Sequence, residues 1–88
     1  MTIENTVPTA ESVTRWSREC IADLLDVPVE SIDPSTSFDR LGVDSAHAVA
    51  LLIEIEERYG VDIPPEALFD DPTLDAVTAF VLDHLAAR

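Results

Sequence analysis

DSAHAVALLIEIEERYG, residues 44–60, carries the clearest helical pattern in the chain. Asp44 is a good N-cap and Gly60 is a natural C-terminal cap, so this stretch predicts a helix from Ser45 to Tyr59. Apolar side chains gather on one side of a helical wheel and form a core stripe, which consists of Ala48, Leu52, Ile55 and Tyr59, with Val49 and Leu51 to either side.

A second apolar strip on the same predicted helix points away from the centre of the core stripe. It contains Ala46, Ala50 and Ile53, and it is bordered by Glu54 and Glu57. Because a monomer does not need this strip for its core, we expect it to dock an apolar spot on a partner that is ringed by cations. For Ile53 the alternative is a wide core face that the preceding loop covers.

A helical period also precedes this stretch. Thr9 can cap a helix that runs from about Ala10 to Leu25, and Pro28 disfavours its continuation because proline lacks an amide hydrogen. Residues at spacings of three and four mark its apolar face: Val13, Trp16, Cys20 and Leu24, flanked by Ile21 and Leu25.

Towards the C-terminus, Pro65 can begin a short helical turn to Phe69, and the period from Thr73 predicts a last helix to about Ala87. We expect the long connection, residues 26–44, to be an ordered loop laid across the core and pinned by Val29, Ile32, Phe38 and Leu41. The fold class is therefore all-α: an antiparallel four-helix bundle of three main helices and one short helix. Residues 1–8 are expected to be a flexible leader, and residues 9–88 the single domain.

The charge of the chain restricts its partners. With 18 acidic and 5 basic residues the net charge is −13, and lysine is absent. Such a surface repels nucleic acid and anionic membranes, so we expect a partner with a basic surface. Simple solubility is the alternative explanation of the acidity.

Cysteine content and hydropathy exclude several further classes. A single cysteine forms no internal disulfide, no cysteine and histidine cluster has metal-ligand spacing, and Cys20 is expected to be a packed thiol. The chain lacks a basic start followed by an apolar run, and no stretch approaches the roughly 18 apolar residues of a membrane span. We expect a cytoplasmic protein without a metal site.

Ser45 is the candidate attachment point for a phosphodiester. As the first residue after a loop it is expected to project from the end of the bundle, Gly42 keeps the approach open, and a helix N-terminus favours an anion. Asp44 opposes the anion in part by its own charge, and it either caps the helix or helps to position a metal-bound phosphate donor. Taken alone, a serine after a capping aspartate is most often only a helix start.

Several motifs in order resemble the acyl carrier protein family over roughly residues 10–87. They are Ile32-Asp33-Pro34, FDRLGVDS at residues 38–45, Gly60-Val61-Asp62-Ile63-Pro64 and Phe69-Asp70-Asp71-Pro72-Thr73. The resemblance implies that a phosphopantetheinyl transferase moves 4'-phosphopantetheine from coenzyme A onto Ser45. The terminal thiol then holds acyl groups as thioesters, and the chain itself has no catalytic residue.

The resemblance also assigns a partner face on the predicted helix 45–59. Glu54 and Glu57, with Glu56 at the rim, would meet arginines and lysines of partner enzymes, and Ala46, Val49 and Ile53 would supply the apolar contact. The side chains of Leu52, Ile55 and Tyr59 would line the gap into which some carriers tuck their acyl chains. Ala46 stands where the family commonly has a bulky residue, and His47 and Ala50 replace residues that are often acidic, which indicates a dedicated partner.

Within the family, Val43 argues against the peptidyl carriers, and the Phe-x-x-Pro-Thr element at residues 69–73 resembles polyketide carriers. We expect the chain to be complete at 88 residues and therefore to be a discrete carrier. The resemblance implies polyketide antibiotic biosynthesis, with a leaning towards amino-acid-derived cargo, and we expect a monomer. Its expected partners are the transferase, an acyltransferase or acyl-loading ligase, and a ketosynthase. The alternatives are a peptidyl or aminoacyl carrier of a nonribosomal pathway and a cofactor-free acidic helical adaptor.

Two further readings of the acidic and hydroxyl residues are disfavoured. A hydrolase with Ser45 as nucleophile lacks the Gly-x-Ser-x-Gly turn, and His47 lies about 200° round the helix from it. A calcium module is disfavoured because Asp70, Asp71 and Asp75 do not follow the ligand spacing of a calcium loop.

Overall fold

The computed structural model describes residues 8–68 and 70–87, and in these ranges the chain forms helices and turns without a strand. The long helices are α1 (Ala10–Leu25), α3 (Ser45–Tyr59) and α4 (Leu74–Ala86). Shorter elements complete the fold in the same ranges: α2 (Phe38–Leu41) and the 3₁₀ turns η1 (Val29–Ser31) and η2 (Pro65–Leu68). The predicted all-α bundle is confirmed. The predicted leader lies outside the described residues except for Pro8.

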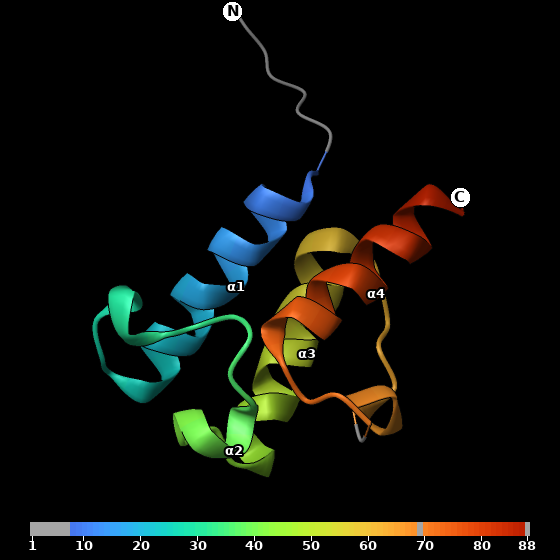
Figure 1. Ribbon diagram of the computed structural model, residues 1–88. Helices are drawn as coiled ribbons and strands as arrows, with labels where there is room; N and C mark the ends of the chain where they lie inside the picture. The colour runs from blue at the N-terminus through green and yellow to red at the C-terminus, as the bar shows by residue number, and fades with distance from the viewer. Residues whose placement is uncertain (1–7, 69, 88) are drawn as a thin grey trace, which may run out of the picture.

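The three long helices pack with α1 running opposite to both α3 and α4 (Figure 1). The connection after α3 returns along the length of the bundle before α4 begins (Figure 1). As a result, the N-terminal ends of α3 and α4 lie at one end of the molecule, beside α2. Backbone hydrogen bonds join this end: the Phe38 N–H donates to the Pro72 carbonyl at 2.8 Å, and the Asp75 N–H donates to the Pro34 carbonyl at 3.1 Å.

Helix α1 has the predicted bounds, and local hydrogen bonds set both of its ends. Thr9 and Ser12 form a capping box, in which each side-chain oxygen accepts the other residue's backbone N–H, at 3.1 and 2.9 Å. At the other end Asp26 adopts the left-handed conformation, with φ of 58°, and the Val27 N–H donates to the Ala22 carbonyl at 3.0 Å. The helix therefore ends at a left-handed cap before Pro28 is reached.

The buried face of α1 differs from the predicted one. Val13, Ser17 and Ile21 are fully buried, whereas Trp16 and Cys20 are half-buried and Leu24 is 37 per cent exposed. The cause is that α1 packs against both α3 and α4, and the small Ser17 faces this junction. Hydrophobicity alone favours the larger apolar residues Trp16, Cys20 and Leu24 over Ser17, so the predicted face was centred on them.

The long connection is ordered, as predicted, and side-chain hydrogen bonds also join it to α1. Arg18 donates from Nε to the Ile32 carbonyl at 2.9 Å and from Nη2 to the Val29 carbonyl at 3.0 Å. Ile32 and Phe38 are buried in the core, and Val29 and Leu41 pack against it. The short helix α2 within this connection was not predicted, because a single helical turn is too short to show a period.

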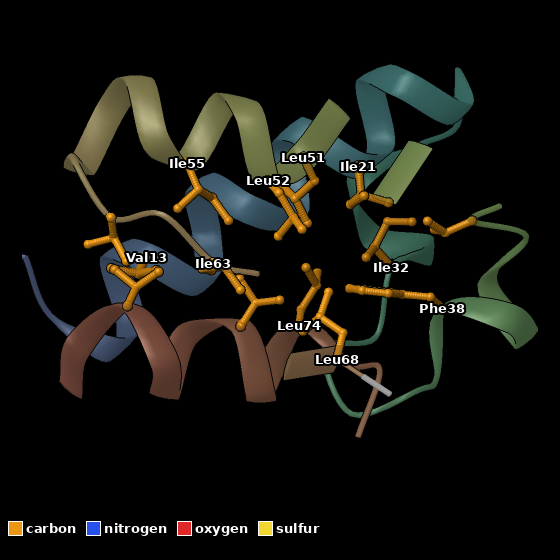
Figure 2. Close-up of a cluster of buried hydrophobic side chains, with 14 of the residues drawn as sticks. Val13, Ile21, Ile32, Phe38, Leu51, Leu52, Ile55, Ile63, Leu68 and Leu74 are labelled. Carbon is orange, nitrogen blue, oxygen red and sulfur yellow. The ribbon is translucent and has the colours of Figure 1, made fainter. Parts of the chain in front are cut away.

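Helix α3 matches its predicted bounds, and its core stripe is largely confirmed. Leu51, Leu52 and Ile55 are buried, and Ala48 and Tyr59 pack against them. Val49 is not a core flank: 46 per cent of it is exposed. Figure 2 shows side chains of all three long helices meeting in one interior with residues of the two connections, among them Val13, Ile21, Ile32, Phe38, Leu51, Ile55, Ile63, Leu68 and Leu74.

The C-terminal elements agree with the predicted ones to within about a residue. The turn η2 begins at Pro65 as predicted and is described to Leu68, since Phe69 lies outside the described residues. Thr73 is the N-cap of α4, and its hydroxyl accepts the Ala76 N–H at 3.1 Å. No helix in the described ranges has the length and apolarity needed to cross a membrane.

Candidate functional site

The turn that precedes Ser45 is fixed by glycine chemistry at Gly42. This residue ends α2 with φ of 87°, a left-handed conformation that favours glycine. The Val43 N–H donates to the Phe38 carbonyl at 2.8 Å and the Gly42 N–H to the Asp39 carbonyl at 3.2 Å, the hydrogen-bond pattern of a Schellman motif. The buried side chains of Phe38 and Val43 anchor this motif, so the chain enters α3 from a fixed position.

Space around Gly42 is open as well. A methyl group added at its Cα would meet no atom within 4 Å. The glycine is therefore required by the backbone conformation, and the surface beside it leaves room for an incoming reagent.

Asp44 caps α3 directly beside the candidate hydroxyl. Its Oδ1 accepts the His47 N–H at 2.9 Å, and its carbonyl accepts the Ala48 N–H at 2.9 Å. The His47 ring nitrogen Nδ1 also lies 3.1 Å from Asp44 Oδ1, without hydrogen-bond geometry. These contacts leave the amides of Ser45 and Ala46 as first-turn donors at the positive end of the helix dipole.

Ser45 is the first residue of α3 and is exposed. An apolar groove of about 280 Å³ starts beside it. The groove runs between α2, α3 and η2, and its lining residues are Phe38, Asp39, Val43, Asp44, Ser45, Ala48, Val49, Leu52, Pro65, Leu68 and Pro72. The hydroxyl thus stands between solvent on one side and an apolar surface on the other.

The predicted partner residues of α3 do not share a single face. Ala46, Ala50, Ile53 and Glu57 follow the helical period on the outward side, whereas Val49 lines the groove beside Ser45. Glu54 lines a different groove, formed with α1. Ile53 is 51 per cent exposed, which excludes the alternative that it belongs to a wide core face.

The predicted acyl-lining residues are also divided. Leu52 lines the groove beside Ser45, but Ile55 is fully buried, and Tyr59 packs edge-on against Trp16 with ring centroids 5.4 Å apart. The groove instead uses apolar residues that sequence reasoning did not assign to it: Phe38, Pro65, Leu68 and Pro72. Phe38 and Pro72 belong to the family motifs at residues 38–45 and 69–73. Their place in these motifs is the sequence feature that could have assigned them to the groove.

A phosphopantetheine attachment site family model matches residues 15–81. The chain belongs to the phosphopantetheine-binding acyl carrier protein family. This carrier is 35 per cent identical to acyl carrier protein TtuC of Teredinibacter turnerae over 80 residues, which cover 91 per cent of each chain. It is 41 per cent identical over 66 residues to conidial pigment polyketide synthase alb1 of Aspergillus fumigatus; the match covers 73 per cent of the carrier but only 3 per cent of the synthase.

A solved structure agrees with this assignment. A free-standing peptidyl carrier protein from a secondary metabolic pathway of Acinetobacter baumannii superposes with a TM-score of 0.79 at 26 per cent identity. The alignment covers 86 per cent of this carrier and 95 per cent of that chain. The acyl carrier fold is therefore present over nearly the whole described chain.

Family membership defines the chemistry: the carrier holds a covalent 4'-phosphopantetheine and is not itself a catalyst. The site fits this group, because it combines an exposed hydroxyl, a helix N-terminus for the phosphodiester and an adjacent apolar groove. Neither histidine activates the serine in this structure. His47 contacts Asp44, and His84 stacks on Phe80 with centroids 4.2 Å apart.

Proposed function

We propose that Ser45 carries the 4'-phosphopantetheine arm, and that the protein is a discrete carrier that presents thioester-bound acyl intermediates to polyketide biosynthetic enzymes. The observation that carries the proposal is the exposed Ser45 hydroxyl at the N-terminus of α3, at the mouth of an apolar groove. No other serine of the described chain combines these features.

Ser45 acts as the acceptor of the arm rather than as a catalyst. Its Oγ forms the new bond to phosphorus, the pyrophosphate linkage of coenzyme A breaks with release of adenosine 3',5'-bisphosphate, and the hydroxyl proton passes to the transferase. The α3 dipole stabilises the resulting phosphodiester by roughly 0.3–1 kcal/mol at an exposed position such as this. Asp44 holds the first turn of α3 in place while its Oδ1 accepts the His47 N–H at 2.9 Å.

The outward side of α3 is proposed as the surface that partner enzymes bind. Ile53 offers an exposed apolar side chain, and the exposed carboxylate of Glu57 lies one turn further along the helix. An apolar contact bordered by acids suits transferases, acyl-loading enzymes and ketosynthases that present arginine and lysine around an apolar spot.

Assignment to a polyketide pathway is supported by the similarity to the carrier segment of a polyketide synthase and by the Phe-x-x-Pro-Thr element at residues 69–73. A second candidate is a peptidyl or aminoacyl carrier, which the likeness to the Acinetobacter peptidyl carrier favours. Both candidates use the same arm on the same hydroxyl. They differ in the group that the arm carries, which is a polyketide acyl group in the first and an aminoacyl or peptidyl group in the second.

Intact mass spectrometry tests the attachment. The purified chain is incubated with coenzyme A, magnesium and a broad-specificity phosphopantetheinyl transferase, together with the variants S45A and S35A. Ser35 is a matched control because it is also an exposed serine and lies ten residues before Ser45. We expect one added arm in the native chain and in S35A, and none in S45A; modification of S45A would refute the assignment.

Loading then separates the two candidate pathways. The holo protein is offered to an acyltransferase with malonyl-coenzyme A and, separately, to an adenylating ligase with amino acids. Malonyl loading supports the polyketide assignment. Exclusive aminoacyl loading would replace it by the second candidate.

A further inference from the structure

A second groove lies on a different side of the molecule, along the C-terminal half of α1 and the start of the following connection. Its volume is about 800 Å³. The lining residues are Trp16, Glu19, Cys20, Ala22, Asp23, Leu24, Asp26, Val27, Pro28, Val29 and, from α3, Glu54. None of them lines the groove beside Ser45, so the two surfaces are separate.

Apolar side chains are exposed in this second groove. Leu24 and Val27 are 37 and 39 per cent exposed, and the half-buried ring of Trp16 lies beside them in the lining. The other large apolar residues with comparable exposure in the described chain are Val49 and Ile53 of α3. Exposed apolar surface is therefore concentrated in two places, and the proposed function accounts for only one of them.

Carboxylates surround this apolar floor. Glu19, Asp23, Asp26 and Glu54 are all exposed, and no basic residue lines the groove. In the described ranges none of these four acids has a basic side chain within 4 Å; the one such contact there joins His47 to Asp44. Cations of a partner would relieve their mutual repulsion.

Two arginines contact residues that line the groove, Trp16 and Val29, but neither lies within 4 Å of its acids. Arg58 lies over the rings of Trp16 and Tyr59, 5.4 and 5.6 Å from their centroids, and Arg18 donates to the Ile32 and Val29 carbonyls. They stabilise the edges of the groove without pairing its acids.

Acids from both helices that line the groove, α1 and α3, act on the Cys20 thiol. Burial, and to a smaller extent the negative charges of Glu54 and Asp23, together raise the pKa of the Cys20 thiol to about 11. One of these carboxylates belongs to α3 and the other to α1, so the negative field spans the groove from wall to wall.

We propose that this groove is a second docking surface, which holds a cationic amphipathic helix of a partner protein. Leu24, Val27 and Trp16 receive the apolar row of that helix, and the four carboxylates pair with lysines and arginines on either side of the row. Charge complementarity favours this occupant. The groove has apolar side chains next to acids, and the proposed helix has an apolar row next to cations. Because the groove does not include Ser45, a partner held there leaves the arm free to reach an active site.

The test uses the full-length holo protein and a synthetic helical peptide in which lysine flanks a row of leucine. Trp16 is the single tryptophan of the chain, so its fluorescence reports binding in this groove without a label. Backbone amide shifts map the contact residue by residue. We expect a saturable change in Trp16 emission, weakened by salt, with the largest amide shifts between residues 19 and 29.

Paired variants separate specific docking from general attraction between opposite charges. E19K/D23K and D62K/D83K each replace two exposed acids by lysine, so each changes the net charge of −13 by four, to −9, but only the first pair lines the groove. L24S/V27S removes apolar side chains from the groove, and V49S/I53S removes apolar side chains of α3 that are more exposed. We expect E19K/D23K and L24S/V27S each to weaken binding by about tenfold or more, and each control to change it by less than about threefold.

Three results would overturn the proposal: equal weakening by both charge pairs, amide shifts centred on Val49 and Ile53, or no change in Trp16 emission. Circular dichroism of each variant shows that it is folded. The outcome is independent of the attachment assignment, because arm addition at Ser45 is read separately by mass.

Discussion

Asp44 Oδ1 accepts the backbone N–H of His47 at 2.9 Å, and this hydrogen bond caps the first turn of α3, the helix that Ser45 begins. Replacing Asp44 by alanine removes the cap, and we expect a loss of about 1 kcal/mol in the free energy of unfolding, measured by urea denaturation. D44N is the matched control, since asparagine is an equally good N-cap. A loss of similar size in D44N would contradict the capping role.

The charge of Asp44 has a separable role beside the candidate acceptor. Its side chain is 67 per cent exposed, so a carboxylate oxygen remains accessible to a magnesium ion that accompanies the phosphate donor. We therefore expect D44N to keep its stability but to accept the arm about tenfold more slowly. Rates measured by intact mass over a range of magnesium concentrations check this, and an unchanged rate would reduce Asp44 to a cap alone.

Gly42 is the next testable position, and two effects oppose each other there. A left-handed conformation costs a residue with a Cβ roughly 1–2 kcal/mol, whereas replacing glycine by alanine restricts the unfolded chain and returns about 0.4–1 kcal/mol. Because the added methyl meets no atom within 4 Å, no clash adds to the balance. We expect G42A to be destabilised by about 1 kcal/mol and G42N, which tolerates this conformation better, by less.

Much of the fold was predictable because its determinants are local. The caps at Thr9, Asp44 and Gly60 and the apolar periods between them gave α1 and α3 the bounds that the structure shows. The buried face of α1 was predicted wrongly because it depends on a tertiary fact, the packing of Ser17 at the junction with α3 and α4. Periodicity does not reveal which side of a helix two neighbours will cover.

The site shows the same division. Ser45, Asp44 and Gly42 are consecutive in the chain or nearly so, and a motif can group them. The groove beside Ser45 also needs Leu68 and Pro72, which the return of the chain after α3 brings to the same end of the bundle. Glu54 and Glu57 are neighbours on α3, and that only Glu54 lines the groove with α1 became visible once α1 was in place.

This separation of the two glutamates predicts different effects on acyl loading. Glu57 lies on the outward side with Ile53, whereas Glu54 lines the groove with α1. We expect I53S and E57R to slow loading by an enzyme that reads the outward side, each by about tenfold, and E54R to slow it less. Stability should stay within about 0.5 kcal/mol in all three, because these side chains are exposed. A greater effect of E54R would place the loading enzyme at the other groove.

Cys20 and the thiol of the arm should differ sharply in reactivity. Burial raises the pKa of Cys20 and the negative charges of Glu54 and Asp23 add to this effect, so that the pKa is about 11. At pH 8 about 0.1 per cent of such a thiol is ionised, against about a quarter of a thiol with the ordinary pKa of about 8.5. The more basic thiolate is intrinsically more nucleophilic by about tenfold, which offsets only part of this difference. We therefore expect iodoacetamide to alkylate the holo protein once rapidly, on the arm, and Cys20 at least about tenfold more slowly.

Because ionisation of Cys20 increases as the pH approaches 11, its alkylation rate should rise about tenfold per pH unit between pH 8 and 10. The double variant D23N/E54Q removes the two charges and should accelerate alkylation of Cys20 in the apo protein, measured by mass. Equal alkylation rates of apo and holo protein would show instead that Cys20 is an ordinary accessible thiol.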